Sequence, residues 1–320
     1  MENKNIKIKF ISLLILTLFL SSCAFGPRPD NTKPMYGEVP LDYRHIRYIE
    51  ANNRFIDDAI KFHGNRNNAA EYYLQVAWAF FSRKDLNVAM MRFNQVWLLN
   101  PEIPDVYFGF AALLEVRGNK TEAERFYKIA FEKDTNNERA KKCLYHIMDI
   151  KGYIGNFEGV LKTVSRFKEH FPNDATMYVK LGYWQSEYEQ LDAAIVSYTR
   201  AIEIDPTSAN AYVNRGYAFF QTNNYDNAKA DYLKAIELDP KYIFAYSNKG
   251  NLELTLNNYE EAKKDFEKCV ELEPKAGELR RYLGIAKQKL NDTIGACEDF
   301  RLAKELGDKE AEKLLKEHCK

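Results

Sequence analysis

The sequence predicts an all-α solenoid of about seven helix-turn-helix repeats, with a capping helix at each end. The passage NNYDNAKADYLKAIELDP at 223–240 recurs as NNYEEAKKDFEKCVELEP at 257–274, and QLDAAIVSYTRAIEIDP precedes it at 190–206; successive copies lie 34 residues apart. Within one copy, Ala228, Tyr232 and Ala235 follow the i, i+4, i+7 spacing of a buried helix face. Each copy ends in a proline, which cannot continue a helix. A fixed period of this length is typical of stacked helical hairpins.

The first element in chain order is a targeting segment. Lys4, Lys7 and Lys9 precede the apolar run FISLLILTLFL at 10–20, which is shorter than the ~20 residues that a membrane-spanning helix needs. The following LSSC at 20–23 resembles the lipobox of bacterial lipoproteins. The resemblance implies that residues 1–22 are a signal peptide and that Cys23 carries acyl chains such as palmitate. The alternative is an ordinary signal peptide with a coincidental cysteine.

A linker and a first helix come next. Residues 23–40 contain four prolines and two glycines among polar residues, so they predict a flexible linker behind the lipid anchor. Within 41–69, Ile46, Ile49, Ile56 and Ile60 share one stripe of a helix, which we expect to cap the solenoid.

The repeats carry fixed residues at fixed places. In frames starting at 175, 209, 243 and 277, the eighth position is always glycine, the twentieth alanine and the twenty-fourth aromatic (Gly182, Gly216, Gly250 and Gly284; Ala194, Ala228, Ala262 and Ala296; Tyr198, Tyr232, Phe266 and Phe300). Small residues let the two helices of a repeat approach, and the aromatic ring fills the space that they leave. This pattern resembles the tetratricopeptide repeat (TPR) family, which implies a right-handed superhelix.

The repeat array has three parts. Residues 175–310 match the family pattern as four TPRs, and weaker copies in frames 70, 104 and 141 make 70–174 three divergent TPRs. Residues 311–320 predict a C-terminal capping helix, because Ala311, Leu314 and Leu315 share one side.

Little in the sequence indicates chemistry. The 46 basic and 46 acidic residues balance and are interspersed, so no electrostatic footprint for nucleic acid is present. The five histidines are scattered without the spacing of a metal site, and the glycines recur with the repeat rather than in a phosphate-binding loop. We therefore expect no enzyme, no cofactor, no metal and no small-molecule substrate.

The remaining cysteines suggest one crosslink. Cys297 lies ten residues before Gly307 and Cys319 lies twelve residues after it. If the chain reverses at Gly307, two antiparallel helices would place the cysteines close enough for a disulfide in an oxidising compartment. The alternative is a pair of thiols. Cys143 and Cys269 lie far apart in the chain and are expected to stay reduced and buried.

The resemblance also implies where a partner binds. In TPR proteins the first helix of each repeat lines a concave groove, and the corresponding residues here mix aromatic and amide side chains; they are Tyr183, Asn210, Val213, Asn214, Tyr217, Phe220, Phe244, Asn248 and Asn251. Aromatic anchors dominate interface energetics, so we expect a protein or peptide partner in this groove. The alternative is that these side chains pack between repeats.

TPR lipoproteins of similar layout act as adaptors or assembly factors, which implies a scaffold in the bacterial cell envelope. Under the rule that Asp after the lipidated cysteine retains a lipoprotein in the inner membrane, Ala24 favours the outer membrane, facing periplasm or exterior. The rival is a co-chaperone-like module that captures C-terminal carboxylates. Val179, Tyr183 and Phe244 argue against it, because they stand where such a clamp needs polar or basic residues.

Overall fold

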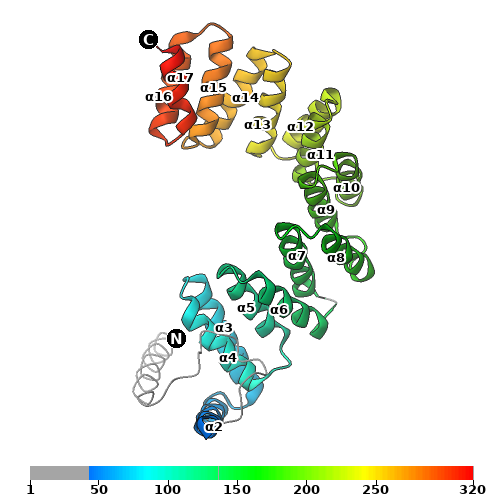
Figure 1. Ribbon diagram of the computed structural model, residues 1–320, viewed down its shortest axis with the longest axis vertical. Coiled ribbons are helices and arrows are strands. Elements are labelled where there is room, and N and C mark those ends of the chain that lie inside the picture. The colour runs from blue at the N-terminus through cyan, green and yellow to red at the C-terminus, as the bar shows by residue number, and fades with distance from the viewer. Residues whose placement is uncertain (1–42, 136, 320) are drawn as a thin grey trace, which may run out of the picture. The chain divides into compact units, whose positions relative to one another are not determined.

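The computed structural model describes residues 43–135 and 137–319, with side chains from residue 50 onward. These residues form sixteen α-helices and no strand. Figure 1 shows them as successive helical hairpins, with one helix before the first pair and one after the last. The predicted all-α solenoid of seven helix pairs with two flanking helices is therefore confirmed.

The helices fall into two compact units, which divide the described residues between Lys133 and Asp134. The first unit contains α2 (Tyr43–His63), α3 (Arg66–Ser82), α4 (Leu86–Leu99), α5 (Pro104–Val116) and α6 (Lys120–Lys133). The second contains α7 (Glu138–Tyr153), α8 (Phe157–His170), α9 (Ala175–Glu187), α10 (Leu191–Ile204), α11 (Ala209–Gln221), α12 (Tyr225–Leu238), α13 (Ile243–Thr255), α14 (Tyr259–Leu272), α15 (Gly277–Lys289), α16 (Thr293–Glu305) and α17 (Lys309–His318). The division falls before the third pair, whereas the sequence changes from divergent to regular repeats after it.

Each hairpin turns at one residue in the left-handed backbone region. That residue is always the fifteenth of its frame: Lys84, Gly118, Gly155, Glu189, Asn223, Asn257 and Asn291. In the α11–α12 turn, the N–H of Asn224 donates to the carbonyl of Phe219 and that of Asn223 to the carbonyl of Phe220. These two bonds form a Schellman motif, which ends the first helix of the pair.

Glycine and an aromatic ring set the spacing within a pair. A Cβ atom added at Gly216 would lie 2.8 Å from Cε1 of Tyr232, and one added at Gly250 would lie 2.8 Å from Cζ of Phe266. Tyr232 and Phe266 are almost fully buried. The expected role of the small eighth residue, to admit the ring of the twenty-fourth, is confirmed at these contacts.

The third pair departs from this pattern. Met148, Val160 and Phe167 stand where small residues belong, and all three are fully buried. Bulky side chains thus fill the α7–α8 interior in place of the glycine and alanine contacts of later pairs.

The last helix packs onto α16 and is crosslinked to it. Ala311 of α17 is buried, and Leu314 and Leu315 are half-buried. Cys297 of α16 and Cys319, the residue that follows α17, form a disulfide with their Cα atoms 5.7 Å apart. The predicted pairing of these two cysteines is the one that the structure contains. Cys143 and Cys269 are buried.

Candidate functional site

The candidate site is a face of α9, α11 and α13, the first helices of three successive pairs. Neighbouring members of this set contact one another directly. Each presents one large aromatic side chain to solvent: Tyr183 is 41% exposed, Tyr217 44% and Phe244 59%. We call this surface, together with Asn210, Asn214, Asn248 and Asn251, the aromatic face.

Asparagines surround the aromatic rings and bond mainly within the chain. Oδ1 of Asn210 accepts from Nδ2 of Asn214 at 2.9 Å and from the Tyr242 hydroxyl at 3.0 Å. Nδ2 of Asn248 donates to the carbonyl of Phe244 at 2.8 Å. The amides therefore order this surface, and part of their hydrogen-bonding capacity is already used.

Two of the residues predicted for the groove, Val213 and Phe220, are less exposed than the three aromatic rings. Val213 is only 4% exposed and lies in the hydrophobic cluster with Tyr232. Phe220 is half-buried against the same cluster, and its ring centroid lies 5.8 Å from that of Tyr225. This cluster also contains Ala245 and Leu252, so it joins α11 with α12 and with α13 of the next repeat, and we leave Val213 and Phe220 out of the aromatic face.

The aromatic face carries no available cation. The basic residues of these three helices each pair with an acid: Lys180 with Asp149, Arg215 with Asp231 at 2.7 Å, and Lys249 with Asp265 at 2.6 Å. Lys249 and Asp265 are both buried, and burial raises the pKa of Asp265 to about 6 against the opposing effect of the Lys249 ammonium. The positive charges of α9, α11 and α13 thus stabilise the repeats themselves.

Sequence reasoning missed one neighbouring residue. Tyr153, the last residue of α7, is 64% exposed. Its ring centroid lies 5.0 Å from that of Trp184, and the Tyr183 ring lies 5.1 Å from Trp184 as well. The sequence signal was an aromatic at the end of a first helix, which the divergence of the third repeat obscured.

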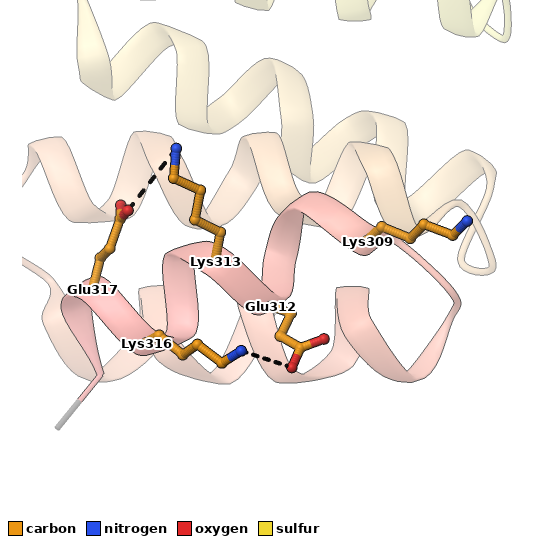
Figure 2. A pocket seen from close by; sticks show the side chains of 5 residues that line it. All are labelled: Lys309, Glu312, Lys313, Lys316 and Glu317. Atoms are coloured by element: carbon orange, nitrogen blue, oxygen red, sulfur yellow. Dashed lines mark ion pairs between the residues drawn. The ribbon is translucent and has the colours of Figure 1, made fainter.

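A second surface in the described part of the chain, on α17, is charged and lacks aromatic anchors. Figure 2 shows a shallow hollow on α17 whose lining is charged: Lys309, Glu312, Lys313, Lys316 and Glu317. Lys316 pairs with Glu312 at 3.1 Å and Lys313 with Glu317 at 4.0 Å, as expected for a solvated helix surface.

Two further features concern metals and membranes. Among residues 43–135 and 137–319, no group of three or more His, Cys, Asp or Glu side chains could hold a metal ion. In the same residues, the helices are too short or too polar to span a bilayer. Cys23, the predicted lipidation site, lies outside the described residues.

Comparison with known proteins identifies the repeat. A family model described as tetratricopeptide repeat matches residues 209–242 and 243–276, and one described as TPR repeat matches 187–223. The fold is an all-α TPR solenoid. The matched segments contain α11 and α13, so two of the helices that carry the aromatic face belong to the best-defined repeats.

Solved structures share the TPR fold. A tetratricopeptide repeat protein from Parabacteroides merdae has a TM-score of 0.58 and 19% identity, over 77% of this chain and 97% of that chain. PilW, described as a widely conserved type IV pilus biogenesis factor, has a TM-score of 0.56 and 14% identity, over 67% of this chain and 98% of that chain. At these identities the likeness concerns the fold alone. A comparison with curated proteins gave no match.

TPR arrays are scaffolds for protein interaction, and the aromatic face is the candidate binding surface of this one. It combines exposed aromatic anchors with asparagines that bond within the chain, and the lysine and arginine side chains of its helices are paired with acids. Such a surface can hold apolar side chains of a polypeptide.

Proposed function

We propose that the protein is a lipid-anchored TPR scaffold of the bacterial cell envelope that binds a protein or peptide partner on its aromatic face. Its task is to support the assembly of an envelope or secretion machine. Cys23 anchors it, residues 24–40 hold the solenoid away from the membrane, and the membrane is the outer one. The proposal adds no catalytic step.

The observation that carries the proposal is the exposure of Tyr183, Tyr217 and Phe244. The packing of the repeats does not require these rings, because Tyr198, Tyr232 and Phe266 already fill the contacts with glycine. Large aromatic side chains left in water are unfavourable unless a partner covers them.

The charges of the aromatic face favour this reading over a carboxylate-capturing module. A partner with a terminal carboxylate needs a cation, and Lys180, Arg215 and Lys249 are each committed to an acid. Breaking the buried Lys249–Asp265 pair to bind a ligand would leave Asp265 buried without its partner, which is strongly unfavourable.

Affinity capture from cells tests the proposal. The full chain and its Tyr217→Ala/Phe244→Ala variant are purified after in-cell cross-linking, and bound proteins are identified by mass spectrometry. We expect the variant to lose one specific partner that Val196→Ala retains, because Val196 is 68% exposed but lies on α10, outside the aromatic face. Equal capture by all three chains would refute the proposed site.

A further inference from the structure

The aromatic face continues onto α7 as a row of four rings. Tyr153, Tyr183, Tyr217 and Phe244 are each more than two-fifths exposed and lie on four successive first helices. Contacts link α7 with α9, α9 with α11, and α11 with α13. We call these four side chains the aromatic stripe.

The stripe runs obliquely across the helices. Tyr153 is the last residue of α7, Tyr183 and Tyr217 are the ninth residues of α9 and α11, and Phe244 is the second residue of α13. With a rise of ~1.5 Å per residue, the step from Tyr217 to Phe244 moves the anchor about 10 Å along the helix axis. Neighbouring helix axes lie about 8–10 Å apart, so successive anchors are about 9–14 Å from one another.

This spacing matches two turns of an α-helix, which advance about 11 Å. Side chains seven residues apart stay on nearly the same side of a helix, with a drift of only ~20° per heptad. An extended strand covers the same distance in about three to four residues, and only a four-residue step returns the next side chain to the same face. A regular strand therefore meets successive rings with one edge only where the spacing is near its upper value, whereas a heptad step of a helix suits the middle of the range.

Hydrogen bonding points the same way. An extended peptide needs partners for its backbone groups, whereas a helix satisfies its own. Part of the asparagine hydrogen-bonding capacity that an extended chain would need is already used inside the protein, through Oδ1 of Asn210 and Nδ2 of Asn248.

Charge restricts the occupant further. Every charged residue of α11 and α13 belongs to an internal pair: Arg215 with Asp231, Lys249 with Asp265, and Glu253 with Lys229. The charges of α11 and α13 are thus used inside the protein, so these two helices suit an apolar partner edge at Tyr217 and Phe244, whereas Glu187 of α9 is exposed four residues after Tyr183.

We propose that the aromatic stripe binds one amphipathic α-helix of a partner protein, whose apolar residues recur every seven positions over about 22 residues. This inference rests on the proposed function, since it specifies the partner of the same site. The apolar edge of the helix would lie across α7, α9, α11 and α13, and its polar side would face solvent.

Site-specific photo-crosslinking in cells tests the proposal on the full chain. The photoreactive residue p-benzoylphenylalanine replaces Tyr153, Tyr183, Tyr217 or Phe244, one at a time, and the crosslinked residue of the partner is mapped by mass spectrometry. Val196 on α10 and Ile294 on α16 are matched controls, because both are highly exposed but lie on second helices. We expect all four stripe positions to capture one segment of one protein, with the mapped residues advancing by about seven per step in a constant direction.

The outcomes separate this inference from the proposed function. Steps of about three to four residues would show an extended chain, and would overturn the helix while leaving the binding site intact. Absence of capture at all four positions, or the same capture at Val196 and Ile294, would overturn the site itself. As a second measurement, a proline placed at the middle of the mapped segment should reduce capture tenfold or more, because it breaks a helix; unchanged capture would overturn the helix.

Discussion

Two tyrosines of the same repeat provide the sharpest test of the aromatic face. Tyr217 lies on α11 and is 44% exposed, whereas Tyr232 lies on α12 and is 1% exposed. Each tyrosine is changed separately to alanine in the full chain. The expected loss of stability differs strongly, because only one of the two side chains leaves a cavity in the core.

The magnitudes follow from the contacts. Tyr232 packs against Gly216 and lies in the cluster of Ala228, Ala235 and Leu252, so Tyr232→Ala should cost ~3–5 kcal/mol. Tyr217 contributes one exposed hydrogen bond, in which Nε2 of Gln221 donates to its hydroxyl. Its removal should cost less than about 1 kcal/mol.

Urea unfolding followed by circular dichroism measures both changes as shifts of the midpoint. A solenoid can unfold in parts, so the comparison uses the transition that α11 and α12 share. If Tyr217→Ala destabilised the chain as much as Tyr232→Ala, then Tyr217 would be a core residue. The aromatic face and both proposals built on it would then be refuted.

Three further predictions concern the anchor, the crosslink and a buried charge pair. Cys23→Ser should release the protein from membranes or leave it unprocessed, and a processed variant that still fractionates with membranes would contradict lipidation. The Cys297–Cys319 disulfide closes a loop of 22 residues, so its reduction should lower the free energy of unfolding by ~3 kcal/mol. We expect a lower melting temperature on reduction, and the same decrease without reductant in the Cys297→Ser/Cys319→Ser variant. An unchanged melting temperature in both cases would contradict the bond. Lys249→Met should cost ~3–5 kcal/mol at pH values where Asp265 stays charged, because it leaves this carboxylate buried without its partner. Burial already raises the pKa of Asp265 to about 6, and loss of the Lys249 ammonium should raise it further. The loss of stability should therefore shrink as pH falls toward 6, where the carboxyl of the variant is protonated, and level off below 6; a loss independent of pH above 6 would exclude Asp265 as its cause.

The sequence by itself determined the repeat and therefore the fold. Glycine at position 8, an aromatic at 24 and proline at 32 act within one hairpin, over at most 34 residues of sequence. They therefore predict the helix pair without any knowledge of where other repeats lie. The pairing of Cys297 with Cys319 was also accessible, because a single chain reversal relates the two.

Only the tertiary structure decided which side chains of the first helices meet solvent. Val213 and Tyr217 lie four residues apart on one helix, and both were expected in the groove, yet one is buried and the other exposed. The difference arises from the angle at which α12 and the neighbouring first helices pack against α11. Side-chain contacts across several repeats set this angle together, so it cannot be derived from one repeat. The pairing of Lys249 with Asp265 and the extension of the stripe to Tyr153 depend on the same packing, since each joins residues from separate helices.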